Sequence, residues 1–412
     1  MKAKRILTVA YGGGHSRMLI PVIRKMRQNG MDVLSLACTL GLADMKSAGL
    51  PFISYIDLMS YLSPAEKLRL SIYEPFIRSL PLNPLVPRSE SYAYYGINFL
   101  ALDKRYESPD RVIEDYKTQG RSLFSPEFVM ERLISRADPA LVIATNSPRT
   151  EKAAIDIAKK LGRHTLCAVD LFFFNNPHVA DPDFCDYWAV FSESIRSKLS
   201  LVAGVPPNRI FVTGNPAFDN LSIVSEKRRN RLVGRSERDQ TVNLLWISAP
   251  EPDRLLPVKV LEDLLRIKRK YGLHVHLTVR LHATEGKKAN SVYGDGLYDC
   301  DFVDQEISIE QCLAGTDVAI AFSSTLAVQA ASAGIPTAQV LGSAYDRSTP
   351  LADYGLVDAA VTFGHDQQGS LSAWLREKIE TIRRGKPIAI AESNLSISAT
   401  DRFISAVHSI IE

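Results

Sequence analysis

Short apolar runs alternate along much of this chain with longer segments that carry apolar residues at helical spacing. The first run, 5–10, leads through a glycine cluster into a predicted helix over 18–29, and a second apolar run covers 32–36. The same order of apolar run, loop and helix recurs at 141–161 and is followed by the run 164–169. Strands that alternate with helices favour parallel sheets, so the pattern predicts an α/β fold.

A charged stretch at 226–239 interrupts this pattern, which then resumes. The second half has apolar runs at 242–247, 274–279 and 318–321 and predicted helices at 258–271 and 309–314. A chain of 412 residues, 46% of them hydrophobic, can bury two separate cores. We therefore predict two domains, at 1–220 and 221–395, and a C-terminal helix at 396–412 that packs back on the first.

Residues 55–136 depart from the alternation of strands and helices. This segment contains several prolines between 75 and 87 and an aromatic cluster of Tyr92, Tyr94, Tyr95 and Phe99. The pattern predicts a long, irregular insertion over the ligand-binding face of the first domain. There it would shape the site of a second substrate, and we expect Tyr95 to contact that substrate.

The charge and cysteine content of the chain indicate which kinds of binding partner and which compartment to expect. Because 49 basic residues are nearly balanced by 46 acidic ones, for a net charge of +3, a nucleic-acid interface is not expected. The charged stretch at 226–239 is either a solvated linker or helix face, or a peripheral contact with anionic lipid headgroups. Neither a signal-peptide core nor a membrane-spanning run is evident. The cysteines favour reduced thiols in the cytoplasm, since they are odd in number and widely spaced, at 38, 167, 185, 300 and 312.

The stretch 318–341 reads as an apolar strand, a hydroxyl-rich turn, a short helix and another strand. Ser323, Ser324 and Thr325 stand where the helix begins, and Gly334 and Pro336 stand where it ends. A helix that begins at the carboxyl end of a parallel strand can bind an anion through its amides and dipole. The turn is either such a phosphate site or an ordinary helix cap.

A second candidate site follows the first strand, in the sequence Tyr-Gly-Gly-Gly-His-Ser at 11–16. Gly13 and Gly14 can allow a ligand to approach the backbone closely. The spacing is neither that of the dinucleotide fingerprint GxGxxG nor that of a P-loop. His15 is a candidate general base because the pKa of histidine lies near neutral pH, the alternative being a histidine that braces the loop.

Four segments in order resemble the two-domain GT-B glycosyltransferases, including the peptidoglycan N-acetylglucosaminyltransferase, and the superfamily that includes the UDP-N-acetylglucosamine 2-epimerases. They are GGGH after the first strand, VTGNP at 212–216, VRLH at 279–282 and the 322–336 stretch. The resemblance implies two Rossmann-like domains facing a cleft. It further implies that Asn215, Arg280 and His282 help to bind a nucleotide-sugar donor.

The departures from these families also carry information. Gln329 stands where many relatives have a glutamate that binds a sugar hydroxyl, and an amide makes a weaker bond than a carboxylate. The paired glutamates of the large retaining transferase families are missing, which favours an inverting reaction. The epimerase signatures are not visible after 141–145, where Asn146 to Thr150 stand instead.

The resemblance assigns roles to the candidate residues. Ser323, Ser324, Thr325 and Gln329 would bind the donor together with the basic strand end, so that no metal and no cofactor is expected. His15 is the first candidate for the base and Asp170 the second, while Arg149 would hold a phosphate or carboxylate of the acceptor. The expected function is transfer of a sugar from a nucleotide to a glycan, a lipid-linked acceptor or a cell-envelope polysaccharide. The alternatives are a 2-epimerase, hydrolysing or not, and a non-catalytic nucleotide-sugar-binding protein.

Overall fold

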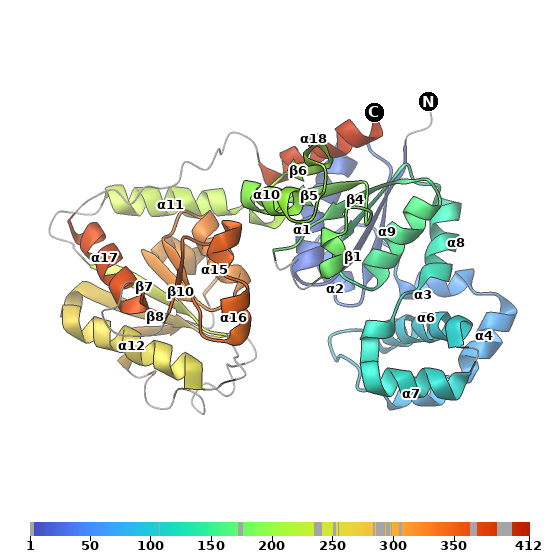
Figure 1. The fold of residues 1–412 in the computed structure, drawn as a ribbon, viewed down its shortest axis with the longest axis horizontal. Coiled ribbons are helices and arrows are strands. Elements are labelled where there is room, and N and C mark those ends of the chain that lie inside the picture. The colour runs from blue at the N-terminus through green and yellow to red at the C-terminus, as the bar shows by residue number, and fades with distance from the viewer. Residues whose placement is uncertain are drawn as a thin grey trace. The chain divides into compact units, whose positions relative to one another are not determined.

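The computed structural model describes residues 4–106, 108–171, 176–234, 241–249, 253, 255–282, 285, 293, 297, 299–304, 307–362, 369–384 and 398–412. The chain divides into two compact units (Figure 1). The first unit comprises residues 1–217 and 397–412, and the second comprises 218–396. Within the described residues, no helix is both long and apolar enough to cross a membrane.

The first unit is built on a six-stranded parallel sheet with the order β2-β1-β3-β4-β5-β6. The strands are β1 (Ile6–Tyr11), β2 (Val33–Cys38), β3 (Leu141–Thr145), β4 (His164–Ala168), β5 (Tyr187–Val190) and β6 (Ile210–Val212). Strand β1 pairs with β2 on one side and with β3 on the other, so Val9 lies opposite both Leu36 and Ala144. The order of strands therefore reverses between β1 and β3, and open α/β sheets bind their ligands at such a switch point.

Helices cover this sheet because each has an apolar face. They are α1 (Gly14–Gln28), α2 (Gly41–Ser47), α9 (Thr150–Lys160), α10 (Glu193–Leu201) and α18 (Ala399–Ile411). Met18, Val22 and Met26 of α1 lie at helical spacing and are buried, as are Phe403 and Val407 of α18. Helix α18 packs against α1 and β6, so the C-terminal end of the chain belongs to the first unit.

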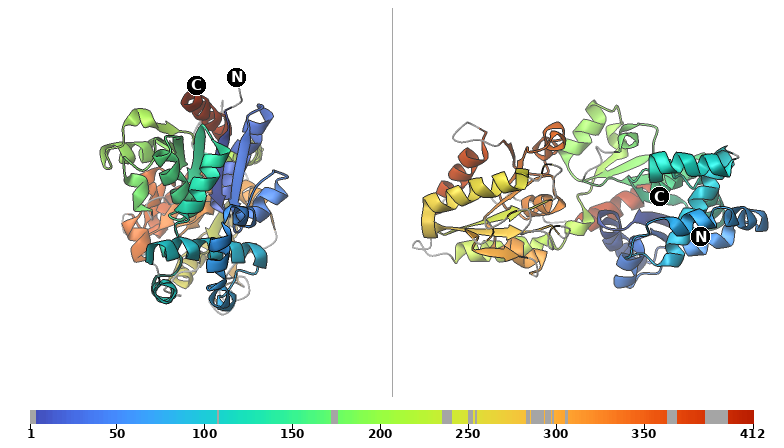
Figure 2. Two further views of the ribbon diagram at one scale, coloured as in Figure 1. Left: turned by 90° about the vertical axis from the view of Figure 1, so that its right-hand side faces the viewer. Right: turned by 90° about the horizontal axis from the view of Figure 1, so that it is seen from below.

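The segment between β2 and β3 was predicted to be irregular, and that prediction is wrong. It forms α3 (Tyr55–Leu58), α4 (Pro64–Ser71), α5 (Glu74–Ser79), α6 (Arg88–Tyr106), α7 (Pro109–Gln119) and α8 (Glu127–Ala137). Pro64 and Pro109 are the first residues of their helices, where the missing amide hydrogen costs nothing. Figures 1 and 2 show α4, α6 and α7 gathered at one end of the first unit, while α8 packs against α9.

Helix α6 is the centre of this insertion, since most of its residues are buried. Its aromatic side chains join those of the neighbouring helices. Phe99 stacks on Tyr73 with ring centroids 5.5 Å apart, and Tyr95 packs edge-on against Phe124 at 5.9 Å. On the same helix, Asp103 accepts two hydrogen bonds from Arg69, at 2.7 and 2.8 Å. The insertion is thus a packed helical layer with its own small core.

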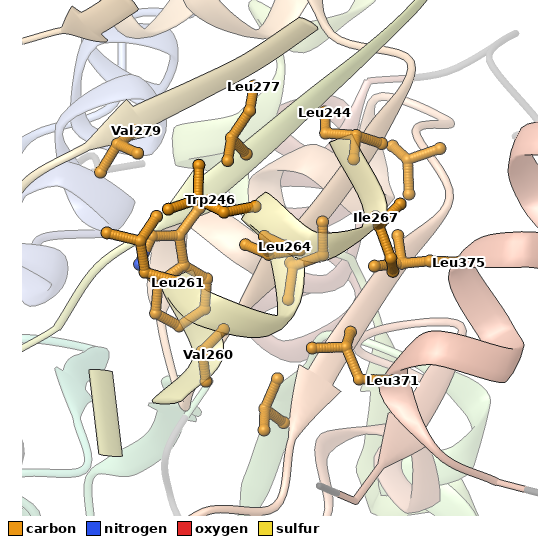
Figure 3. Packing of buried hydrophobic residues seen from close by; sticks show 14 of the residues in the cluster. Leu244, Trp246, Val260, Leu261, Leu264, Ile267, Leu277, Val279, Leu371 and Leu375 are labelled. Carbon is orange, nitrogen blue, oxygen red and sulfur yellow. The ribbon is translucent and has the colours of Figure 1, made fainter. Parts of the chain in front are cut away.

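The second unit contains another six-stranded parallel sheet, with the order β12-β11-β10-β7-β8-β9. The strands are β7 (Val242–Ile247), β8 (Val275–Arg280), β9 (Phe302–Asp304), β10 (Val318–Ala321), β11 (Thr337–Val340) and β12 (Ala359–Val361). The helices are α11 (Leu221–Val233), α12 (Leu255–Tyr271), α14 (Ile309–Gly315), α15 (Thr325–Ser332), α16 (Ala344–Ser348) and α17 (Leu371–Arg383). Figure 3 shows the core, where Leu261 and Leu264 of α12 lie beside Trp246 of β7. The switch point of this sheet lies between β7 and β10.

Part of the charged stretch at 226–239 lies on α11, and the rest lies outside the described residues. Arg228 is 1% exposed and donates to the carbonyl of Gly334 at 2.8 Å. Arg231 donates to the buried carboxylate of Asp317 at 2.6 Å. These two arginines therefore bind groups of their own unit, at the end of α15 and the start of β10. The expectation of a helix is confirmed for 226–233, but Arg228 is buried and Arg231 pairs with Asp317, so neither is a freely solvated charge of the helix face.

Candidate functional site

A cavity of about 860 Å³ lies in the first unit, next to the switch point of its sheet. One wall comes from the carboxyl ends of β1, β2 and β3 and contains Tyr11, His15 and Arg149. The helical insertion supplies the opposite wall, from residues 81–86 and from α6 and α7, and this wall includes Tyr95. The topology thus brings three of the residues expected from the sequence, His15, Arg149 and Tyr95, to one cavity.

His15 lies in the first turn of α1 and is held from two sides. Its Nδ1 forms a hydrogen bond with the hydroxyl of Thr145 at the end of β3 and lies 3.6 Å from Oε2 of Glu151. Its Nε2 lies 3.8 Å from Oδ2 of Asp170, which follows β4. The imidazole is 22% exposed, so it reaches solvent while its orientation is fixed. Both candidates for the base, His15 and Asp170, therefore lie together.

Glu151 was not predicted from the sequence, although it is the most buried charge of this cluster. Its carboxylate is fully buried and accepts the backbone N–H of Tyr11 at 2.7 Å and that of Ser147 at 2.9 Å. These bonds join the end of β1 to the loop after β3. Acidic residues are common in the first turn of a helix, so the position of Glu151 in the sequence did not single it out.

The glycine cluster serves the fold in a different way from the one expected. A Cβ on Gly12 would lie 2.3 Å from Cβ of Leu40, so glycine is needed where two loops pack closely. Gly13 has φ of 77°, and its amide donates to Oδ2 of Asp44 at 3.1 Å. Gly14 begins α1 near the carboxylate of Asp170. Gly12 thus packs against protein backbone while also lining the cavity, and the contact of Gly13 and Gly14 with a ligand stays a prediction.

Buried hydroxyl groups form a hydrogen-bond network beneath the residues that line the cavity. Thr150 forms hydrogen bonds with the phenols of both Tyr11, at 2.8 Å, and Tyr55. Burial raises the pKa of Tyr11 and of Tyr55 well above the ordinary value, so both phenols stay protonated at neutral pH. The guanidinium of Arg149 lies 4.8 Å from the centre of the Tyr11 ring. Burial alone would lower the pKa of Arg149, but its neighbours Tyr11 and Tyr94 raise it, and the side chain stays charged.

In the second unit, the 323–325 turn lies at the switch point, directly after β10. Ser323 does not point its polar groups outward. Its amide and its hydroxyl both donate to Oδ1 of Asp346, at 3.2 and 2.7 Å, and its hydroxyl accepts from Gln339 at 2.9 Å. Asp346 is 1% exposed and was not predicted from the sequence. Ser323 thus holds the turn in place in this structure, a role different from the expected contact with phosphate.

Ser324 and Thr325 lie at the N-terminus of α15. The hydroxyl of Ser324 accepts the amide of Leu326 at 3.2 Å and so caps the helix, while Thr325 is exposed. Gln329 lies one turn further along α15 and is partly buried. The geometry therefore brings Ser324, Thr325 and the first amides of α15 to one end of the helix.

The end of β8 carries the other expected donor-binding residues. Arg280 is the last residue of this strand and donates to the carbonyl of Ile307 at 3.0 Å. His282 is exposed, and its amide donates to Glu285 at 3.1 Å. Glu285 also accepts the hydroxyl of Ser248, at 2.8 Å, from the loop after β7. This buried carboxylate, which the sequence motifs did not indicate, joins the ends of β7 and β8.

Asn215 lies at the end of the first unit, after β6. Its side-chain oxygen accepts the amide of Ala217 at 3.0 Å, so it stabilises the turn there. The preceding Gly214 has φ of 76°, and a Cβ on it would lie 2.8 Å from a guanidinium nitrogen of Arg402 in α18. Within the first unit, the VTGNP segment is therefore part of the contact between β6 and the C-terminal helix.

The sequence matches no protein-family model and no curated protein sequence. The structure is similar to that of UDP-GlcNAc 2-epimerase from Neisseria meningitidis bound to UDP-GlcNAc, with a TM-score of 0.60, 12% identity, and coverage of 98% of this chain and 99% of that one. The structure is also similar to UDP-GlcNAc 2-epimerase from Methanocaldococcus jannaschii, with a TM-score of 0.57, 14% identity, and coverage of 98% of this chain and 99% of that one. For the Anabaena protein HepE, in complex with UDP and glucose, the TM-score is 0.52 and the identity 14%, with coverage of 98% of this chain and 99% of that one. These similarities confirm the predicted two-domain α/β fold and the resemblance in fold to this superfamily.

Proposed function

We propose that this protein is an enzyme that acts on a nucleotide sugar and, more specifically, an inverting glycosyltransferase. The observation that carries the proposal is the cavity beside His15, because a transferase needs room for an acceptor next to its base. Its volume of about 860 Å³ lies within the range of small-molecule sites. The similar structures of the Neisseria epimerase with UDP-GlcNAc and of HepE with UDP and glucose support a nucleotide sugar as the donor.

In the proposed reaction, His15 takes a proton from the acceptor hydroxyl. Its Nδ1 is occupied by Thr145, so Nε2 is the atom that receives the proton, and Asp170 stabilises the resulting imidazolium from 3.8 Å. The acceptor oxygen forms a bond to the anomeric carbon, and the nucleoside diphosphate leaves with the electron pair of the broken bond. The negative charge of this leaving group would be stabilised by Ser324, Thr325, the amides of α15 and Arg280.

The second candidate is a 2-epimerase, which the similarity to two epimerase structures favours. In that reaction His15 and Asp170 would act as acid and base on the sugar itself. An epimerase needs no site for a second substrate, whereas the insertion adds a wall to the cavity beside His15. This wall is the reason that we prefer the transferase.

A panel of UDP-, CMP-, GDP- and TDP-sugars, each incubated with and without a mixture of sugar acceptors, separates these functions. We expect nucleotide release to depend on the acceptor. Inversion at C2, or free sugar formed without any acceptor, would establish the epimerase class in place of the transferase. Binding without turnover would leave a nucleotide-sugar-binding protein.

The contribution of α15 to donor binding can be tested with Ser324→Asp. Aspartate caps a helix about as well as serine, so α15 should stay folded, but a carboxylate at this end of the helix repels a diphosphate. We expect the affinity for UDP, GDP, CMP or TDP, whichever the panel selects, to fall roughly 10-fold to 100-fold by calorimetry. Ser63→Asp is the control, because Ser63 caps α4 in the first unit. Equal affinity in Ser324→Asp and the unmodified protein would exclude this helix from the donor site.

A further inference from the structure

The residues that line the cavity of the first unit carry positive charge. Arg121 and Arg149 are among the residues that line it, and none of the described residues along its walls is an aspartate or a glutamate. Carboxylates do lie behind the walls, but their oxygens are engaged. Glu151 accepts the amides of Tyr11 and Ser147, and Glu90 accepts those of Tyr55 and Ile56. Asp170 lies beside His15, so the positive part of the surface that faces a bound molecule is the part around Arg121 and Arg149.

Two polar atoms of residues that line the cavity have no hydrogen-bond partner among the described residues. The hydroxyl of Ser147 is buried, in a residue that is 5% exposed, and Nε of Arg149 is buried as well. Buried polar atoms in proteins are almost always paired, because leaving one unpaired costs free energy. Ser147 and Arg149 are two residues apart in the loop after β3, and both line the cavity. Their unpaired donors indicate that a bound group supplies the missing acceptor atoms.

The position of Arg149 is fixed before any ligand arrives. Its guanidinium lies against the ring of Tyr11, whose hydroxyl is in turn bonded to Thr150. A planar guanidinium held in this way can bind the two oxygens of a carboxylate or phosphate at once. The lining also includes Tyr94, whose hydroxyl accepts from that of Tyr11 at 3.3 Å, and Tyr95 and Tyr116 of the insertion; aromatic rings suit the apolar face of a sugar ring.

We propose that the cavity selects an acceptor that carries an oxyanion, a phosphate or a carboxylate, which binds Arg149 and the hydroxyl of Ser147. Arg121, which is exposed at the same cavity, adds positive charge that attracts the acceptor. The hydroxyl that receives the sugar then lies toward His15. The inference rests on the proposed transferase function, and it adds the chemical class of the acceptor.

The test is a measurement of binding to the full chain without nucleotide, which is independent of turnover. The probes are glucose 1-phosphate, glucuronic acid and glucose, so that phosphate, carboxylate and neutral sugar are compared. We expect at least one charged probe to bind more tightly than glucose, and its affinity to fall as NaCl is raised. Which charged probe binds more tightly decides between phosphate and carboxylate. Equal binding of all three, or binding of none, would overturn the inference.

Variants then locate the oxyanion. Arg149→Gln should weaken the preferred charged probe roughly 10-fold to 100-fold and leave glucose unchanged. Arg149→Lys keeps the charge without the planar fork and should lie in between. Ser147→Ala removes only a hydroxyl and should cause a smaller loss. The control is Arg163→Gln. Arg163 directly precedes β4, at the amino ends of the strands and away from the cavity at their carboxyl ends, and it pairs with Asp138.

The two proposals fail in different ways. A preference for charged probes that disappears in Arg149→Gln, in a protein that shows no acceptor-dependent turnover, would support the anion site and reject the transferase. Turnover with neutral acceptors only, unaffected by Arg149→Gln, would support the transferase and reject the anion site.

Discussion

Replacing His15 by glutamine is expected to lower acceptor-dependent turnover by roughly 100-fold to 10,000-fold, the usual contribution of a general base. Glutamine has a similar size and can keep the hydrogen bond to Thr145. It cannot take a proton at the position of Nε2. Because the imidazole is 22% exposed and lies at the cavity, the fold should tolerate the change. Steady-state kinetics with saturating donor, together with calorimetry of nucleotide binding, measure the two effects separately.

Nucleotide affinity should remain nearly unchanged in His15→Gln, because the groups proposed to bind the diphosphate lie in the second unit. His408→Gln is the matched control, since His408 is an exposed histidine on α18 in the same unit. Asp170→Asn should lower turnover less than His15→Gln, as Asp170 acts on the imidazolium and is not itself the base. Unchanged turnover in His15→Gln would remove His15 from the mechanism. A larger loss in Asp170→Asn would make Asp170 the base.

The hydrophobic pattern predicted the parallel sheets because their strands are buried on both faces. Strands β1 and β3 consist almost entirely of apolar residues and have no exposed position. The loops after these strands could also be located, since parallel strands end at the same edge of a sheet. His15, Asp170 and Arg149 were therefore found as candidates from their positions after predicted strands.

The partners of these residues could not be predicted in the same way. Thr145 is separated from His15 by 130 positions, and Glu151 is separated from Tyr11 by 140. Each looks like an ordinary strand or helix residue by its local pattern. Their roles depend on the order of strands in the sheet, which places β3 next to β1. Local spacing carries no information about that order.

The helical insertion shows a different limit. Its prolines between 75 and 87 suggested irregular structure, and 80–87 is indeed not helical, but Pro64 and Pro109 begin helices. Serines stand just before both of them, as they commonly do at helix N-termini, and this combination was the available sign. That the insertion forms one wall of the cavity is visible only in the structure, where Tyr94 lies against Tyr11 of β1.

Replacing Asp346 by asparagine is expected to destabilise the second unit by about 2–4 kcal/mol. The Asp346 carboxylate is buried and accepts from the amide and hydroxyl of Ser323 on one oxygen, and from those of Ser343 on the other. An asparagine keeps one accepting oxygen. At the position of the other carboxylate oxygen it has an NH₂ group, which faces hydrogen-bond donors and cannot accept from them. Two donors at the carboxyl end of β10 or at the start of α16 would then lose their acceptor.

Because the chain has two units, a single unfolding midpoint would not isolate this effect, and hydrogen exchange measured by peptide is the suitable readout. Amides of 322–328 should exchange faster in Asp346→Asn, while those of the first unit stay the same. Asp353→Asn is the control, since Asp353 is an exposed aspartate in the same unit. The turn that Ser323 holds leads directly into the cap of α15, so nucleotide affinity should fall along with this protection. Loss of protection with full nucleotide affinity would mean that Asp346 serves only the fold, and unchanged exchange would mean that its hydrogen bonds do not hold the turn.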